Sequence, residues 1–303
     1  MRVTQSMISN NMLTNLSNSY SKLDQYNNQL STGKKISKPS DDPVVAMKGI
    51  FYRSDVTQVE QYKRNLGEAT NWAESSDSAL NDVNSSLQRI RELTVQGAST
   101  GTNTPDSQQA LADEVKQLID HIGTIGNTMV GDKYIFNGSD TTNKPVNIQL
   151  SAPDSQGQIT VGGNAQATNS NYNVEVSKGV KLTVNVDPTN IFDMQTFTTL
   201  TNVYNNLVSG DPNAINQSLG DVDKIISNVS TARTKVGATQ NRIDMISDRL
   251  DNQEVVANRI MSANEDADVD QVITNLKTQQ SVQNAALGVG ARIIQPTLLD
   301  FLH

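Results

Sequence analysis

The stretch VEQYKRNLGEATNWAESSDSALNDVNSSLQRIRELT, residues 59–94, decides the fold of this chain. Apolar or small residues recur in it at alternating steps of three and four, the pattern of a helix with one continuous buried stripe. Asp42 followed by Pro43 is typical of a helix start, and the next proline is Pro105. The sequence therefore predicts one helix from Pro43 to about Gly97, roughly 80 Å long at ~1.5 Å per residue. Its stripe comprises Val59, Tyr62, Leu66, Ala69, Ala73, Ser76, Leu80, Val83, Leu87, Ile90 and Thr94.

Both ends of the chain carry the same three-four alternation. Gly33 is a typical helix stop after the first stripe, and the register of the last long stripe slips near Asp268. A third helix is expected from Pro105 to about Met129. The first stripe contains Leu13, Leu16, Tyr20, Leu23 and Leu30; the last long stripe contains Ile243, Ile246 and Leu250; the final segment carries Leu276, Leu287, Ile294, Leu298 and Leu299.

The middle of the chain has a different period. Apolar residues alternate with polar ones in short runs, as in Tyr172–Val176 and Val180–Val186, and Ser177-Lys178-Gly179 separates these two runs. Period two with turn residues between the runs is typical of β-hairpins. The sequence therefore predicts a small antiparallel β domain inserted at residues 133–195.

These patterns predict a mainly α fold with a small β insert. The N- and C-terminal helices are expected to pack into an elongated antiparallel coiled-coil rod, because an amphipathic helix needs a partner for its stripe. The expected domains are 1–42 with 268–303 as terminal helices, 43–132 with 196–267 as the helical rod, and 133–195 as the β insert. The terminal helices are the most polar, so they are expected to be disordered or marginally stable in an isolated monomer.

Composition excludes several classes of function. Hydrophobic residues make up 36% and aromatic residues 4%, which is too few for a thick globular core. The chain has no cysteine and only two histidines, His121 and His303, so we expect no enzyme activity, no metal site and no cofactor. The net charge of −8 disfavours nucleic-acid binding, and no long apolar run predicts membrane insertion.

Two charged clusters flank the predicted helix breaks. Glu265, Asp266, Asp268 and Asp270 begin like a calcium loop, but Gln271 and Lys277 occupy the positions where an EF-hand needs glycine and glutamate. The acidic cluster is therefore expected to be a solvated face or a helix N-cap. The basic turn at residues 34–38 is likewise expected to be solvated.

Three motifs resemble the terminal signatures of the bacterial flagellin superfamily. They are LSTGKKISKPSDDPVVA at 30–46, SALNDVNSSLQRIRELTVQG at 78–97 and LGVGARIIQPTLLDF at 287–301. Within the superfamily, PSDDP at 39–43 and GDKYIFNGSDTTNKPV at 131–146 are similar to the hook-associated protein 3 branch. The resemblance covers roughly residues 1–140 and 195–303.

The resemblance implies a non-enzymatic structural subunit of the bacterial flagellum, an adaptor at the hook–filament junction. Its implied partners are copies of itself, neighbouring hook-associated protein and flagellin subunits, and a cytoplasmic export chaperone. It implies an extracellular location reached through the flagellar type III apparatus, without a cleaved signal peptide. In flagellins the stretch similar to residues 87–96 is a contact surface, which contains Arg89 and Arg91 here.

Alternatives remain open at this point. From their pattern alone, the terminal stripes fit either a monomeric helical bundle or pairing with neighbouring subunits, and the resemblance favours pairing. The Leu13–Leu30 and Leu276–Leu299 residues named above are then the assembly seams, and Val59, Leu66, Leu80, Leu87, Ile90, Ile243, Ile246 and Leu250 form the rod seam. A filament flagellin is the alternative within the family, and a cytoplasmic coiled-coil binding module is a more distant one.

Overall fold

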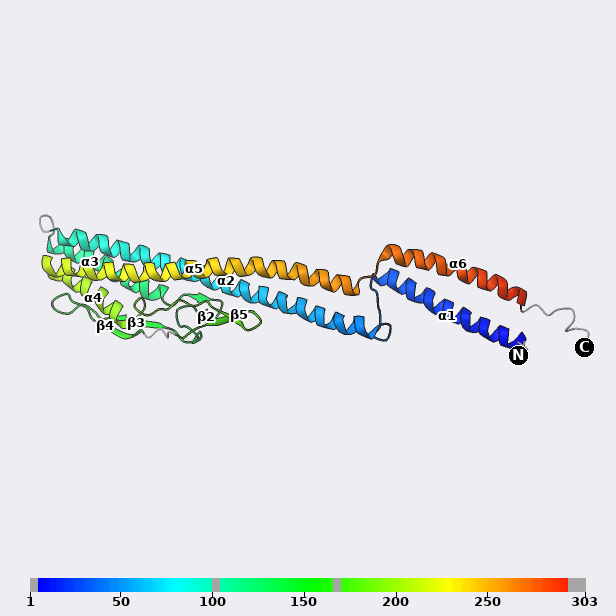
Figure 1. Ribbon diagram of the computed structural model, residues 1–303. Helices are drawn as coiled ribbons and strands as arrows, with labels where there is room; N and C mark the ends of the chain where they lie inside the picture. The colour runs from blue at the N-terminus through cyan, green and yellow to red at the C-terminus, as the bar shows by residue number, and fades with distance from the viewer. Residues whose placement is uncertain (1–4, 100–103, 166–169, 294–303) are drawn as a thin grey trace, which may run out of the picture. The chain divides into compact units, whose positions relative to one another are not determined.

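A computed structural model describes residues 5–99, 104–165 and 170–293 (Figure 1). This part of the chain contains six helices and three two-stranded sheets. The helices are α1 (Gln5–Thr32), α2 (Pro43–Ala98), α3 (Pro105–Ile125), α4 (Met194–Ser209), α5 (Pro212–Glu265) and α6 (Val269–Ile293). The strands are β1 (Met129–Val130), β2 (Lys133–Tyr134), β3 (Val146–Leu150), β4 (Val161–Ala165), β5 (Asn173–Ser177) and β6 (Val180–Thr183). The expected mainly α fold with a small β insert is confirmed.

The chain forms two compact units. The first unit is Met1–Val59 with Asn252–His303, and the second unit is Glu60–Asp251. The long helices α2 and α5 contribute residues to both units. The domain boundaries expected from the sequence, at 42/43 and 267/268, stay predictions, and the two units are described separately below.

In the second unit, α2 and α5 run antiparallel with a buried apolar seam between them. Leu66, Leu80, Leu87 and Ile90 of α2 are buried, as are Ile243, Ile246 and Leu250 of α5. Ion pairs join the helices at three levels: Lys63 with Asp251, Asp77 with Arg233, and Arg91 with Asp223, at 2.7, 3.1 and 2.7 Å. Along this row, the residue numbers increase on α2 and decrease on α5, as expected for antiparallel helices.

The sign of the charge alternates along this row of ion pairs. The residues on α2 are 14 apart and read Lys63, Asp77, Arg91, so they occupy the same position in every second heptad. Their partners on α5, Asp251, Arg233 and Asp223, are 18 and 10 residues apart, so sliding one helix along the other would separate the pairs. Flanking charges of this kind set the register and orientation of coiled coils.

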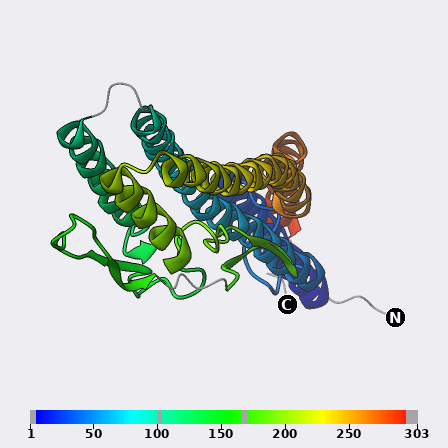
Figure 2. The same ribbon diagram turned by 90° about the vertical axis from the view of Figure 1, so that its left-hand side faces the viewer.

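The β insert packs beside α3 and α4, which lie side by side (Figure 2). Strand β3 contacts α3, and its antiparallel partner β4 contacts α4. The hairpin β5–β6 turns at 178–179, as the alternating apolar pattern predicts. The third helix is shorter than expected, because Gly126 caps it after Ile125 and Met129 belongs to β1.

A stacked aromatic pair holds the β insert on α2. The rings of Trp72 and Tyr172 are 4.8 Å apart and nearly parallel, at 21°. The Tyr172 hydroxyl donates a hydrogen bond to Glu68 Oε1 at 2.9 Å, and Lys133 Nζ donates to the same atom at 3.1 Å. These bonds lower the pKa of Glu68, with the Lys133 bond as the larger cause. The insert is thus fixed to α2 by both stacking and charge.

In the first unit, α1 and α6 lie side by side (Figure 1). Their interface is partly polar, since Ser19 and Gln283 are buried and Gln279 Nε2 donates to Ser19 Oγ at 2.8 Å. Gly290 lies against Met12 so closely that a Cβ there would overlap the Met12 side chain. An interface with so few large apolar side chains contributes only a modest hydrophobic stabilisation.

Candidate functional site

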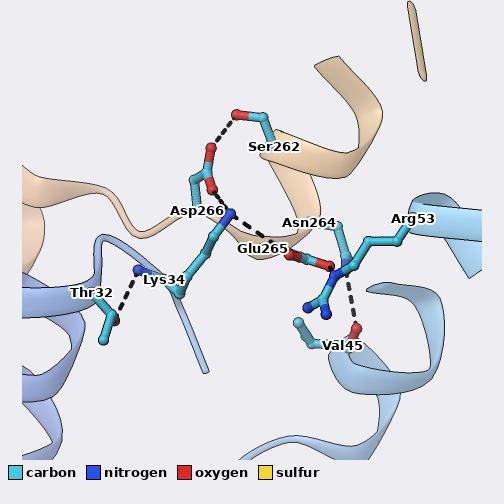
Figure 3. A network of polar contacts seen from close by, with 8 residues as sticks. All are labelled: Thr32, Lys34, Val45, Arg53, Ser262, Asn264, Glu265 and Asp266. Carbon is cyan, nitrogen blue, oxygen red and sulfur yellow. Dashed lines mark hydrogen bonds and ion pairs between the residues drawn. The ribbon is translucent and has the colours of Figure 1, made fainter. Parts of the chain in front are cut away.

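The end of α1, the first turns of α2 and the end of α5 meet around a buried carboxylate in the first unit (Figure 3). Glu265, the last residue of α5, is only 4% exposed. Its Oε1 accepts a hydrogen bond from Arg53 Nε of α2 at 2.7 Å, and its Oε2 lies 3.7 Å from Lys34 Nζ. A buried carboxylate needs such partners, because an unpaired charge away from water is strongly destabilising.

Backbone hydrogen bonds tie the residues after α1 to the segment between α5 and α6. Lys35 N donates to Glu265 O at 2.6 Å, and Ala267 N donates to Gly33 O at 2.9 Å. Lys34 and Asp266 thereby form an isolated antiparallel β-bridge. Gly33 permits this turn because its φ is +66°, a conformation that glycine adopts at little cost.

Side chains reinforce this bridge. Lys34 Nζ donates to Asp266 Oδ1 at 2.7 Å, and Ser262 Oγ donates to Asp266 Oδ2 at 2.5 Å (Figure 3). The Lys34 bond, followed by the Ser262 bond, lowers the pKa of Asp266, and the Asp266 bond is the main cause of a raised pKa of Lys34. Nearby, Asn264 Nδ2 donates to Val45 O at 3.0 Å. We call these residues, Lys34, Arg53, Asn264, Glu265 and Asp266, the polar joint.

The sequence interpretation of the two charged clusters was therefore incomplete. Glu265 is buried rather than part of a solvated face, and Lys34 is engaged by both acidic residues. The N-cap interpretation holds for Asp268, whose Oδ1 accepts a hydrogen bond from Gln271 N at 3.1 Å. The opposite charges at the two helix breaks, Lys34-Lys35 and Glu265-Asp266, were the signal that could have revealed the joint.

An apolar face of α2 lies exposed beside the polar joint. Val44, Met47 and Phe51 follow one another at steps of three and four, and Met47 and Phe51 are each 68% exposed. The neighbouring Ile50 is equally exposed. The end of α5 in the same unit exposes Val255, Val256 and Ile260. Exposed apolar residues gathered in this way are typical of surfaces that contact another molecule.

The structure places the N-terminal seam residues on two sides of α1. Leu16 and Leu23 are partly buried, whereas Leu13, Tyr20 and Leu30 are exposed. On α6, Leu276 is partly buried and Leu287 is exposed. Ile294, Leu298 and Leu299 lie outside the described residues.

All eight rod-seam residues are buried. Seven of them lie in the second unit, and Val59 lies at the border of the first. The arginines of the 87–96 stretch have partners within the chain: Arg89 Nε is 2.7 Å from Glu114 Oε1 of α3, and Arg91 pairs with Asp223 of α5.

Other kinds of site have little support in the described ranges. A cavity of about 280 Å³ in the second unit is lined mainly by asparagine, threonine and valine, with Asp187 and Lys235 as its charged residues. Among residues 5–99, 104–165 and 170–293, no three His, Cys, Asp or Glu side chains gather as a metal ion would require. No helix within these ranges has the length and hydropathy of a membrane span.

Sequence comparisons identify relatives at both ends of the chain. Residues 3–141 match the bacterial flagellin N-terminal helical region, and residues 219–302 match the bacterial flagellin C-terminal helical region. A flagellin of Bacillus subtilis is 26% identical over 248 residues, covering 80% of each chain. A flagellin of Salmonella derby is 26% identical over 280 residues, which cover 90% of this chain but only 48% of that protein.

Solved structures share the fold. A putative flagellar hook-associated protein from Vibrio parahaemolyticus has a TM-score of 0.64 at 21% identity, covering 75% of this chain and all of that one. FlgL of Bacillus cereus has a TM-score of 0.57 at 20% identity, covering 70% and 99%. The flagellar junction protein FlgL of Legionella pneumophila has a TM-score of 0.54 at 15% identity, covering 74% and 100%.

The two matched helical regions together span most of the chain and flank residues 142–218, which include much of the β insert. They correspond to the helices that form the polar joint, the exposed apolar faces and the buried seam. The resemblance seen in the sequence motifs is thereby confirmed, and the chain belongs to the bacterial flagellin superfamily of structural proteins, the components of the bacterial flagellum.

Proposed function

We propose that this protein is a structural adaptor at the hook–filament junction of the bacterial flagellum. The fold it shares with FlgL proteins supports this assignment, as does the PSDDP motif at residues 39–43. Its helices in the first unit assemble with copies of the chain and with neighbouring hook-associated protein and flagellin subunits. The role is mechanical and not enzymatic.

The exposed apolar faces of the first unit carry this proposal. Leu13 and Tyr20 on α1 and Met47 and Phe51 on α2 are each more than half exposed, while Ser19 and Gln283 occupy buried positions between α1 and α6. Covering a half-exposed side chain of this size stabilises an interface by about 1–2 kcal/mol. Several such side chains per subunit give many weak contacts that add around a ring.

The remaining parts of the proposal follow from the family. The subunit reaches the outside of the cell through the flagellar type III apparatus, without a cleaved signal peptide, after release from a cytoplasmic export chaperone. No membrane insertion and no nucleic-acid binding are involved, in keeping with the net charge of −8.

The location of the protein on intact flagella tests the assignment. In a strain that lacks the chromosomal copy, an antibody against the tagged full chain should label one band between hook and filament. Label spread along the whole filament, or retained in the cytoplasm, would overturn the junction assignment.

A pair of variants tests the assembly surface. Met47→Ser with Phe51→Ser removes two side chains that are mostly exposed, so the monomer should fold and be exported while filaments detach into the medium. Val180→Ser is the matched control, since it removes an exposed apolar side chain from β6 in the second unit and should leave filaments attached. Equal attachment in both strains would show that the α2 face is not an assembly contact.

A filament flagellin is the second candidate. The 26% identity to Bacillus subtilis flagellin over 80% of both chains favours it. Purified protein seeded with filament fragments distinguishes the two: a filament flagellin elongates the seeds without limit, whereas an adaptor stops at a short, constant addition.

A further inference from the structure

Helix α5 ends at Glu265 and α6 begins at Val269, although the sequence between them contains no helix breaker. Residues 262–272 read SANEDADVDQV, with neither proline nor glycine. Other helix ends in this chain do carry such residues, as with Gly33 after α1, Pro105 at the start of α3 and Gly210 after α4. Asp268 caps the start of α6 and is one local cause of the break. The other cause lies in contacts from elsewhere in the chain.

Residues Gly33–Lys35, which we call the clip, supply those contacts. Glu265 O accepts its hydrogen bond from Lys35 N, whereas in a continuous helix it would accept one from Val269 N. Ala267 N donates to Gly33 O, whereas in a continuous helix it would donate to Ala263 O. The clip thus occupies one backbone acceptor and one backbone donor that a helix running through the break would need.

A helix running through the break would make five further backbone hydrogen bonds, from the amides of residues 267–271. The broken arrangement offsets these with the two bonds to the clip and the bond from Gln271 N to the Asp268 side chain. Side-chain contacts then help to decide which arrangement is favoured. The hydrogen bond from Lys34 to Asp266 and the Asp268 cap on Gln271 N favour the break. The helix propensity of Ala267 and the freedom that the Lys34 side chain regains favour a continuous helix.

We propose that the segment 266–268 is a two-state element, in which α5 and α6 join into one helix over 212–293 when the clip leaves. The clip holds the break open by a β-bridge, and Lys34 secures it through Asp266 and Glu265. The orientation of α6 relative to α5 is then set by the presence or absence of residues 33–35. This inference concerns the fold itself and does not depend on the proposed function.

Amide hydrogen exchange, resolved by NMR in the full chain, tests the proposal. The first amides of a helix have no acceptor within that helix, so Val269 and Asp270 should exchange fast in the wild-type protein. Lys34→Ala combined with Asp268→Ala weakens the clip and removes the cap. In this variant, the exchange of both amides should slow at least tenfold, because they gain the carbonyls of Glu265 and Asp266 as acceptors.

A proline at position 269 provides the matched control. Val269→Pro is compatible with the break, because proline is well tolerated at the first position of a helix, but it blocks a helix running through. Added to the Lys34→Ala/Asp268→Ala variant, it should restore fast exchange at Asp270, whereas Val269→Ala should not.

Two outcomes would overturn the two-state element. Exchange at Val269 and Asp270 that stays fast in Lys34→Ala/Asp268→Ala would show that the side chains of Lys34 and Asp268 do not hold the break as proposed. Loss of protection throughout α6, including Leu276 and Gln279, would show that the clip is needed for α6 itself to be helical.

Discussion

Gly49 of α2 and Glu265 of α5 lie so close that a Cβ built on Gly49 would be 2.5 Å from Glu265 Oε1. Glycine at position 49 therefore makes the space in which the buried carboxylate meets Arg53. The absence of one side chain on α2 allows a charge on α5 to be buried and paired.

Gly49→Ala tests this relationship. Alanine favours a helix over glycine by ~1 kcal/mol, but here the added Cβ displaces Glu265 from Arg53, and disturbing a buried charged group costs roughly 1–3 kcal/mol. We expect a net loss of local stability of up to about 2 kcal/mol. Faster hydrogen exchange in peptides from residues 45–56 and 258–268 would measure this loss.

Gly67→Ala is the control for this change. Gly67 lies in the same helix, and the space that a Cβ would occupy there is open, with no neighbouring atom within 4 Å. Alanine at this position should therefore slow exchange locally by its helix propensity alone. Equal stabilisation by both alanines would mean that Glu265 moves aside at no cost.

Acid should weaken the polar joint through Asp266. Its pKa in the folded protein lies below the ordinary value, so its pairing with Lys34 stabilises the fold at pH values above about 4 and is lost as the pH falls through the lowered pKa. Asp266→Asn should therefore be less stable than wild type in urea unfolding at pH 6, and the difference should shrink towards pH 3. A difference independent of pH would contradict the role of the carboxylate charge.

The alternating ion pairs should contribute to the α2–α5 register. Asp77→Arg places an arginine opposite Arg233, so that two like charges repel each other. The variant should destabilise the second unit by only about 0.5–1 kcal/mol, since the pair is partly exposed. The double swap Asp77→Arg/Arg233→Asp should recover most of that loss in chemical denaturation. If the double swap is no more stable than the single variant, the pair does not act through its charges.

Gly290 should control how closely α1 and α6 pack. A Cβ at this position overlaps Met12, so Gly290→Ala should speed hydrogen exchange along α1 despite the better helix propensity of alanine. Gly288, two residues earlier, has open space around its Cβ position, and Gly288→Ala should slow exchange instead. Slower exchange in Gly290→Ala together with faster exchange in Gly288→Ala would show that α1 packs against another face of α6.

Much of the fold could be predicted from the sequence. Long three-four patterns identify α2 and α5, because one buried stripe recurs over many turns, and Pro43, Pro105 and Gly33 mark helix ends directly. The hairpin β5–β6 follows from strict alternation around Lys178-Gly179. In α1 the stripe was harder to identify, because Met12 and Ser19 face α6 while the larger Leu13 and Tyr20 face outward.

The polar joint could not be predicted in the same way. It brings together Lys34 and Asp266, which are 232 residues apart, and periodicity within one helix says nothing about such pairs. The space for Glu265 depends on a single glycine, Gly49, which in sequence is no different from the open Gly67. Contacts of this kind follow from how the helix ends meet.

The stacking of Trp72 on Tyr172 gives the protein an intrinsic spectroscopic reporter. Trp72 is the sole tryptophan of the chain, it is 1% exposed, and it belongs to the second unit. Its fluorescence emission should shift to the red when the β5–β6 hairpin leaves α2, and the first unit contributes no indole signal. A melting curve recorded by emission therefore follows the second unit alone, and its comparison with total ellipticity reveals whether the two units unfold together.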